Sequence, residues 1–230
     1  MLMLFGTHNL LRLQTEHFPK LLHAFMQQNF RQPPVLDNTV WCLGCSHVYG
    51  VGVDESVSIC SILAKLINAP VDNLGIPGAS TEMVIAIYLY LIARHRPRGV
   101  VILWPHWPRK MVVLPERILR LGMWTFENPN YACDEYADIL AGFKQELVNG
   151  QLQKATWNTI RGFEGMHAET KNFHATTYQK AIEAGNHTRL QKTPQGFLDL
   201  GDDNEHSGPI SHAAAARGLA EVIKTHWHIS

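Results

Sequence analysis

The sequence has little charge, and the charge that it has is balanced. Charged residues make up 17% of the 230 residues, against about 25% in a typical soluble domain. There are 20 basic and 20 acidic side chains, so the formal net charge is +0, and no run of five like charges occurs. A nucleic-acid-binding module needs a basic excess on one face, so the composition argues against a nucleic-acid partner. At 46% hydrophobic residues, intrinsic disorder is also excluded.

Long apolar runs and abundant cysteines are missing as well. The longest apolar run, Met83 to Ala93, is shorter than the roughly 20 residues that span a bilayer. The first residues lack the basic segment and the small-residue cleavage site of a secretory signal. Four cysteines are present, which is few for a disulfide scaffold: Cys42, Cys45, Cys60 and Cys133. We therefore expect reduced thiols, a cytoplasmic location and no membrane partner; the oligomeric state is left open.

The order of apolar segments predicts an α/β fold. Continuous apolar runs typical of buried parallel strands occur at 39–43 and 99–104, and residues 71–74 read as a short strand between them. Helical patterns follow the segments 39–43 and 71–74, beginning after Asp54 and Ser80, both of which are good N-cap residues. Alternation of strands and helices is typical of a three-layer α/β/α domain with a mostly parallel central sheet.

The whole chain, residues 1–230, is expected to form one domain. Residues 1–35 form a helical lead-in that ends at consecutive prolines. Near the C-terminus, residues 196–200 read as a last strand, and Pro209 as the start of a final helix to about Lys224. Residues 110–196 carry no chemical signature. We expect them to be a helical insertion that shapes the site, with helices at 134–148 and 151–163.

Three short segments fall where strands are expected to end, the edge of an open α/β sheet at which ligands bind. The first holds Ser46 in Gly-Cys-Ser-His, although a serine after a glycine is more often a turn residue. The second holds Asp203 and His206, which could activate a serine hydroxyl, or could be a solvated acidic loop with a surface histidine. The third is the glycine turn at 73–78, whose backbone N–H groups could bind an oxyanion or simply join a strand to a helix.

Taken together and in this order, the three segments resemble the motif blocks of the SGNH (GDSL-like) hydrolases. The family's Gly-Asp-Ser block is similar to the Gly-Cys-Ser that ends at Ser46, and its glycine block falls on Gly78. Its last block, Asp-x-x-His with a second histidine six residues on, is similar to Asp203, His206 and His212. The resemblance covers roughly residues 39–105 and 196–224.

The resemblance implies a serine esterase or acyl hydrolase that needs neither cofactor nor metal. Ser46 would be the nucleophile, His206 the general base and Asp203 the carboxylate that orients it. The backbone N–H groups of Ser46 and Gly78 would form two arms of the oxyanion hole. The implied reaction is acyl transfer through an acyl-enzyme, with a small ester or acylated carbohydrate as the substrate.

Two departures from the family pattern bear on activity. Cys45 replaces the aspartate of the first block, and Trp-Pro-His-Trp at 104–107 replaces the family's Gly-x-Asn-Asp block. His106 could replace the missing amide donor through a ring N–H, or could be a packed or solvated side chain. Arg109 could bind an acidic group of the substrate. Trp104 and Trp107 could line a substrate groove or pack in the core.

Two other function classes stay open at this point. The altered blocks favour an SGNH-like descendant that binds a ligand, such as a glycan or an acylated molecule, without turning it over. Cys42 and Cys45 have the spacing of a redox motif, but no helix opens directly after them as in thioredoxin-like proteins. No second cysteine pair is present to complete a tetrahedral zinc site.

Overall fold

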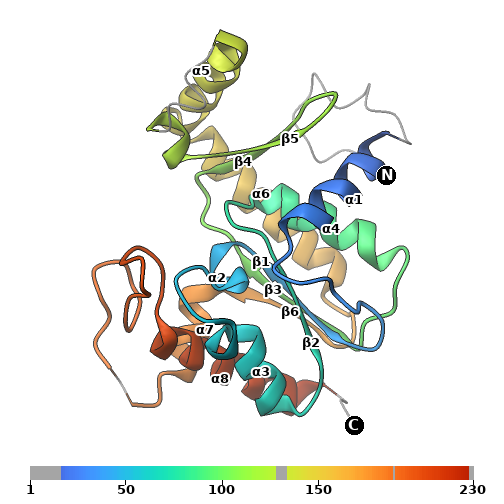
Figure 1. The fold of residues 1–230 in the computed structure, drawn as a ribbon, viewed down its shortest axis with the longest axis vertical. Coiled ribbons are helices and arrows are strands. Elements are labelled where there is room, and N and C mark those ends of the chain that lie inside the picture. The colour runs from blue at the N-terminus through green and yellow to red at the C-terminus, as the bar shows by residue number, and fades with distance from the viewer. Residues whose placement is uncertain (1–16, 128–133, 189, 228–230) are drawn as a thin grey trace.

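A central parallel sheet organises the chain. The computed structural model describes residues 17–127, 134–188 and 190–227. Four strands are hydrogen-bonded in the order β2-β1-β3-β6, and each neighbouring pair is parallel (Figure 1). The bounds of these strands are Val40–Gly44 for β1, Val71–Gly75 for β2, Gly99–Trp104 for β3 and Phe173–Thr177 for β6.

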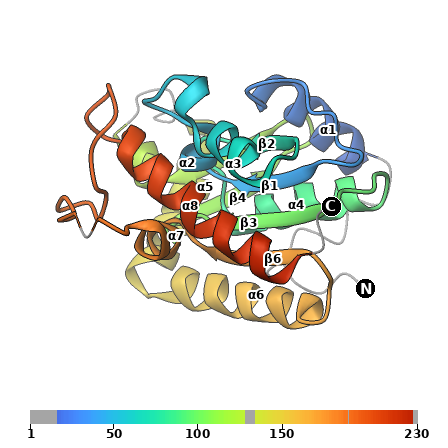
Figure 2. The same ribbon diagram turned by 90° about the horizontal axis from the view of Figure 1, so that it is seen from below.

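Helices cover both faces of this sheet, which confirms the predicted α/β/α architecture (Figures 1 and 2). Side chains of β1 alternate between two hydrophobic cores: Trp41 and Leu43 belong to one, and Val40 and Cys42 to the other. Because both faces are covered, the central strands are apolar throughout. The first core is covered by α1 (His17–Asn29), α4 (Thr81–Ile92) and α6 (Gln151–His167). The second core is covered by α3 (Ile59–Ile67), α7 (Tyr178–Gly185) and α8 (Pro209–His226).

Hydroxyl side chains cap the helices that follow β1 and β2. Ser80 caps α4 by accepting a hydrogen bond from the Met83 N–H, as its position in the sequence predicts. Asp54 is different: it caps the short 3-10 helix η2 (Glu55–Val57), and Ser58 caps α3. The helix expected directly after Asp54 therefore begins later, at a second cap.

The expected strand at 196–200 is wrong. Among the described residues, the only strand-type pairing of this segment is an isolated bridge between Leu200 and Ser207. Asp199 explains the difference, because its carboxylate accepts the N–H groups of Ile210 and Ser211, both at 2.8 Å, at the start of α8. The segment therefore caps α8 rather than pairing with the sheet. The strand that completes the sheet beside β3 is β6.

Residues 110–196 differ from a helical insertion in two places. A β-hairpin forms first, from β4 (Arg109–Val113) and β5 (Ile118–Gly122), and β6 joins the main sheet. The expected helix at 134–148 is present as α5 (Asp134–Val148), and α6 extends beyond the expected 163 to His167. Figure 1 shows the hairpin and α5 standing away from the sheet, where they share a small separate core with the start of α6.

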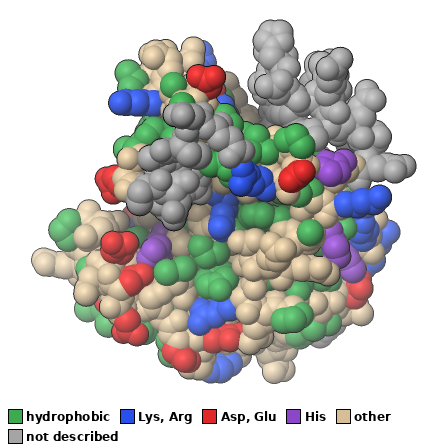
Figure 3. Space-filling model, turned by 45° about the horizontal axis from the view of Figure 1, so that its top comes forward, with side chains coloured by type: hydrophobic (Ala, Val, Ile, Leu, Met, Phe, Trp, Pro, Cys, Tyr) green, Lys and Arg blue, Asp and Glu red, His purple; other side chains and the backbone are tan. Residues whose placement is uncertain are grey.

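The surface shown in Figure 3 carries interspersed acidic, basic and hydrophobic side chains, as the balanced composition predicts. The helical lead-in is present as α1, and its first 16 residues lie outside the part of the chain that the structure describes. Within that part, no helix combines the length and the apolar character needed to cross a bilayer.

Candidate active site

Ser46 lies at the carboxyl end of β1, at the start of the short helix α2 (Ser46–Tyr49), with Cys45 as the N-cap residue. The strand can turn into this helix because residue 44 is glycine. A Cβ at Gly44 would lie 2.5 Å from Cγ2 of Val48 and 2.8 Å from the carbonyl oxygen of Leu103. Ser46 is only 3% exposed, and its Oγ lies 4.0 Å from Sγ of Cys45.

The glycine loop after α2 is held in place by an arginine that sequence reasoning missed. Gly50 and Gly52 have φ values of 84° and 80°, a backbone region that favours glycine. Arg31 donates hydrogen bonds to the carbonyl oxygens of Tyr49 and Gly50, both at 2.9 Å, and of Val53 at 3.2 Å. Nothing near Arg31 in the sequence indicates this role, because the contact joins segments about 20 residues apart.

Asp203 and His206 form a hydrogen-bonded pair on the loop before α8. Oδ2 of Asp203 lies 2.7 Å from Nδ1 of His206. Oδ1 accepts the backbone N–H groups of Glu205 at 3.0 Å and of His206 at 2.9 Å. Burial acts to raise the pKa of Asp203, but the two N–H groups and the His206 ring outweigh it, and the pKa falls to about 2. The carboxylate is therefore ionised at neutral pH.

The loop that carries this pair packs against the loop that follows Ser46. The N–H of Asp202 donates to the carbonyl oxygen of Gly52 at 2.9 Å. A Cβ on Gly52 would lie 3.0 Å from Oδ1 of Asp203, so only glycine lets the two loops approach so closely. The rings of His47 and His206 meet edge to face with centroids 6.1 Å apart. Among the described residues, no hydrogen bond joins Ser46 to His206, and the triad stays a prediction.

Gly78, the expected second arm of the oxyanion hole, lies on a tight turn beside α2. Its φ is 75°. Arg120 donates a hydrogen bond of 2.6 Å to the carbonyl oxygen of Pro77, the residue before Gly78. The ring of Trp124 would lie 3.2 Å from a Cβ at Gly78. At the start of the same turn, a Cβ on Gly75 would lie 2.3 Å from the backbone nitrogen of Tyr49. The end of β2, where the turn begins, is thus in direct contact with α2, whereas Gly78 lies against Trp124. The oxyanion role of Gly78 stays a prediction.

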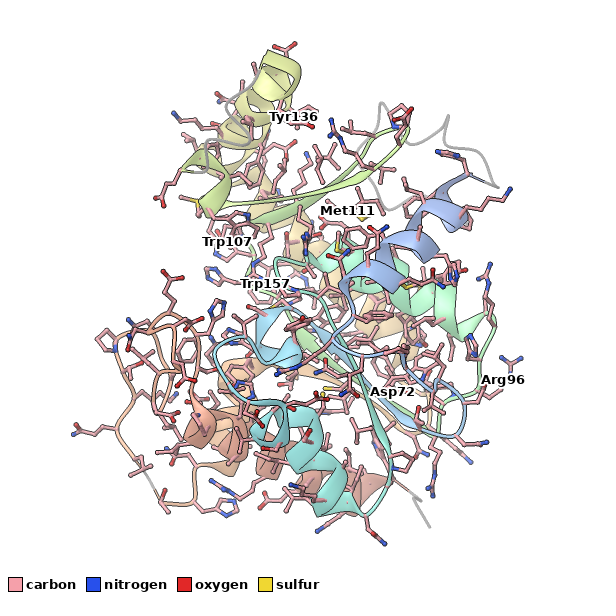
Figure 4. The ribbon with its side chains drawn as sticks, in the orientation of Figure 1. Asp72, Arg96, Trp107, Met111, Tyr136 and Trp157 are labelled. Carbon is pink, nitrogen blue, oxygen red and sulfur yellow. The ribbon has the colours of Figure 1, made fainter. Side chains whose placement is uncertain are left out.

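A cavity of about 220 Å³ opens beside α2, and the segment 104–109 forms much of its wall. Trp107 and Trp157 approach it from different parts of the chain (Figure 4). Its lining residues come from α2, from the segment after β3, from α6 and from the β6–α7 junction: His47, Trp104, Pro105, His106, Trp107, Arg109, Thr156, Trp157, Ile160, Thr177, Tyr178 and Gln179.

The four residues predicted at 104–109 are placed differently along this wall. Trp104 is 5% exposed and donates its indole N–H to Glu164 at 2.7 Å, so most of the ring belongs to the core. His106 is exposed to solvent, but partial desolvation of its ring, followed by the nearby Arg109 charge, lowers its pKa. Arg109 lies over the Trp124 ring, 5.4 Å from its centroid, and donates to a backbone carbonyl at 3.3 Å. Trp107 lines the cavity. Substrate contacts by these side chains stay predictions.

A buried hydrogen-bonded network adjoins the cavity, and sequence reasoning missed it. Ser207 Oγ lies 3.2 Å from Nδ1 of His47 and 3.2 Å from Nε2 of His212, and it accepts the Tyr178 hydroxyl at 3.0 Å. The His47 and Tyr178 rings stack with centroids 4.3 Å apart and planes 3° from parallel. The second histidine of the last motif block was the only signal for this network in the sequence.

Burial keeps this network uncharged at neutral pH. Desolvation, followed by the charge of Arg109, lowers the pKa of His47 to about 3. Desolvation is also the main cause that lowers the pKa of His212 to about 4. For Tyr178 the same effect raises the pKa above that of a free phenol.

The cysteines do not form the pair that their spacing suggests. Cys42 and Cys45 are both free and buried, and they belong to hydrophobic cores on opposite sides of the sheet. A hydrogen bond with Cys42, together with burial, raises the pKa of Cys60. Cys133 lies outside the described residues. Within them, no group of three or more histidine, cysteine or acidic side chains is arranged to hold a metal ion.

No protein-family model matches the chain, and no curated protein matches it. Among solved structures, it is similar to a candidate lipolytic protein of the G-D-S-L family from Desulfitobacterium hafniense DCB-2, with 14% identity, a TM-score of 0.42, and coverage of 81% of this chain and 99% of that one. It is also similar to a candidate SGNH hydrolase from Slackia heliotrinireducens, with 15% identity, a TM-score of 0.38 and the same coverages of 81% and 99%. The likeness concerns the fold alone, and both proteins carry the name of the family that the sequence motifs resemble.

Proposed function

We propose that the protein is a serine hydrolase in which Ser46 attacks an ester and His206, oriented by Asp203, moves the protons. The observation that carries the proposal is the 2.7 Å hydrogen bond between Asp203 Oδ2 and His206 Nδ1. A carboxylate that accepts the Nδ1 proton leaves Nε2 of the neutral ring unprotonated, so that Nε2 can take a proton from a hydroxyl.

The proposed reaction has two stages. In the first, Ser46 Oγ bonds to the ester carbonyl carbon while its proton passes to Nε2 of His206. The bond from that carbon to the leaving oxygen then breaks, and His206 returns the proton to the departing alcohol. In the second stage, water gives a proton to His206 while its oxygen bonds to the acyl carbon. The bond from that carbon to Ser46 Oγ then breaks, the acid is released, and His206 returns the proton to Ser46 Oγ. For the first step, the Ser46 hydroxyl has to rotate away from Cys45.

Backbone N–H groups would stabilise the negative charge that develops on the carbonyl oxygen. The N–H of Ser46 is at the first position of α2, where the helix offers it no internal partner. Gly78 offers a second N–H from the turn that begins where β2 contacts this helix. Each such donor contributes on the order of 3 kcal/mol to transition-state stabilisation. His106, in the position of the family's asparagine, is a candidate third donor.

The cavity favours a small substrate. Its volume is about 220 Å³, and aromatic rings form much of its lining. A short-chain ester or a small acylated carbohydrate would place a limited group against these rings. The triad residues, the oxyanion donors and the substrate class all belong to this proposal.

Labelling with a fluorophosphonate probe tests the proposal. We expect the wild-type protein to be labelled, and both Ser46→Ala and His206→Ala to lose labelling while keeping their circular dichroism spectra. Ser56→Ala is the matched control, because Ser56 is an exposed serine bonded to Asp54, and it should label like the wild type. Wild-type levels of labelling in Ser46→Ala would refute the assignment of the nucleophile.

One observation favours a second function, ligand binding without turnover. Ser46 is 3% exposed, and its hydroxyl lies 4.0 Å from a cysteine sulfur while making no hydrogen bond to a histidine nitrogen of the described residues. A folded wild-type protein that binds small esters without hydrolysing them, and that fluorophosphonate does not label, would establish this alternative.

A further inference from the structure

The buried network around Ser207 fixes where each of its protons lies. The backbone N–H of Ile59 donates to Nδ1 of His212 at 3.0 Å. An imidazole nitrogen that accepts a hydrogen bond carries no proton, so the proton of the neutral His212 ring is on Nε2. His212 is fully buried, which keeps the ring in this state. The Nε2–H group of His212 therefore donates to Ser207 Oγ, 3.2 Å away.

The hydrogen bonds of Ser207 determine in turn which nitrogen of His47 carries the proton. A hydroxyl oxygen has two lone pairs and one proton. The lone pairs of Ser207 Oγ accept from His212 and from the Tyr178 hydroxyl, which lies 3.0 Å away and stays protonated. The remaining proton then points to Nδ1 of His47, at 3.2 Å. Since this nitrogen accepts, the proton of the His47 ring is on Nε2.

Nε2 of His47 makes no hydrogen bond with any other described residue, and the side chain lines the aromatic cavity. The ring cannot swing away easily, because it stacks on Tyr178 and meets Phe197 edge to face with centroids 5.1 Å apart. The result is a single N–H donor, held rigidly by packing, on the residue that follows the candidate nucleophile Ser46 in the chain.

A second polar group in the same cavity also lacks a partner. Thr156 on α6 is 2% exposed, and its Oγ1 is a buried atom without a hydrogen bond. An unpartnered buried hydroxyl costs stability unless something binds to it. Thr156 lines the cavity together with His47, Trp107 and Trp157, so an unpartnered buried hydroxyl lies within the cavity wall.

We propose that this cavity binds a small uncharged molecule through a hydrogen bond from the His47 Nε2–H to a carbonyl oxygen, with the apolar part of the molecule against Trp107 and Trp157. Identifying this molecule as the acyl ester substrate rests on the serine hydrolase function proposed above, whereas the binding itself does not. His47 would then be a specificity-determining residue that recognises the carbonyl group.

The charged and titratable groups near His47 agree with an uncharged ligand. Arg109, His106, His206 and His212 are the groups that disfavour protonation of His47, after burial. Among the described residues that line the cavity there is no carboxylate, and Arg109 is the one charged side chain. That guanidinium is already engaged by the Trp124 ring and a backbone carbonyl.

Nuclear magnetic resonance of the wild-type protein labelled with ¹⁵N on histidine tests the proton assignment without a mutation. We expect the His47 ring to show protonated Nε2 and unprotonated Nδ1, with no titration between about pH 5 and pH 8. A His47 ring that carries its proton on Nδ1, or that is charged at neutral pH, would overturn the proposal.

Ligand binding is tested with two molecules of similar shape, acetophenone and isopropylbenzene, of which only the first has a carbonyl oxygen. The wild type should bind acetophenone about tenfold more tightly, the factor that one hydrogen bond supplies. His47→Phe keeps the stacking on Tyr178 and should lose this preference, whereas His47→Gln keeps an N–H donor and should retain part of it. Equal preference in the wild type and in His47→Phe would refute the role of His47.

Benzoate distinguishes an anion site from the proposed one. Tighter binding of benzoate than of acetophenone would assign the cavity to Arg109 and overturn the inference. None of these ligands can be hydrolysed, so a protein that fails the fluorophosphonate test can still pass this one, and the two proposals fail separately.

Discussion

Asp203 holds His206 through a 2.7 Å hydrogen bond from Nδ1 to Oδ2, while its other carboxylate oxygen is occupied by two backbone N–H groups of the same loop. The carboxylate therefore cannot rotate without breaking three hydrogen bonds. Because Asn204 between them adopts a φ of 57°, the loop turns tightly enough to bring both residues together. The pair is thus built locally, from four consecutive residues.

Asp203→Asn should remove most of the hydrolytic activity while leaving the fold intact. An amide can donate its N–H to Nδ1 of His206, which would move the ring proton to Nε2 and abolish the base. In serine hydrolases with such a triad, this change lowers the rate on the order of 10⁴-fold. Hydrolysis of a short-chain ester, measured with circular dichroism as a check on folding, gives the comparison. A loss below about tenfold would show that Asp203 does not orient the catalytic base.

Gly44→Ala should destabilise the protein by about 1–3 kcal/mol, because the new methyl group would meet Val48 and the carbonyl oxygen of Leu103 in a packed region. Gly162→Ala is the matched control. It lies in α6 with no heavy atom within 4 Å of the new Cβ, so helix propensity should increase stability by about 0.5–1 kcal/mol. Urea unfolding of both variants measures the difference. Equal effects of the two substitutions would contradict the close packing beneath Ser46.

The parts of the fold that could be predicted are those in which local pattern and tertiary structure agree. The strand at 99–104 and the helix at 134–148 were predicted with the bounds that the structure has. The segment 196–200 has the apolar character of a strand, yet Asp199 caps α8. The sequence predicts both the segment and the helix, but it does not show that the Asp199 carboxylate will turn back to the helix start, because that contact is made only in three dimensions.

In the candidate site, too, contacts within one segment could be predicted, whereas contacts between distant segments could not. Ser46, Asp203 and His206 are predicted from short motifs, and the contact between Asp203 and His206 could be expected because their spacing within one loop is visible in the sequence. Arg31 and Tyr178 were not found, because each acts on a loop far along the chain. Their contacts depend on the packing of α1 and α7, which no local pattern reports.

Thr156→Val should stabilise the empty protein by about 1 kcal/mol, because it removes a buried hydroxyl that has no partner and keeps the shape of the side chain. Thr125→Val is the matched control. Thr125 is equally buried, at 2% exposure, but its hydroxyl donates to the carbonyl oxygen of Gly122 at 2.6 Å. That substitution should destabilise by a similar amount. Destabilisation by both variants would indicate that the Thr156 hydroxyl has a partner in solution.

Stability should fall as the pH is lowered from neutral, because His47 and His212 are held neutral in the folded state. Their pKa values, about 3 and about 4, lie below the ordinary value of 6.5. At pH values between these folded-state pKa values and 6.5, the unfolded chain binds protons that the folded protein does not. Lowering the pH through this range therefore favours unfolding, and stability rises again as the pH returns to 6.5. Each group contributes at most about 1.4 kcal/mol per pH unit.

Urea unfolding between about pH 4 and pH 7 measures the slope of stability against pH. This slope should be smaller in His47→Phe, where one of the two groups is missing. An unchanged slope in that variant would show that His47 is charged in the folded protein, contrary to the proton arrangement inferred from Ile59, His212 and Ser207.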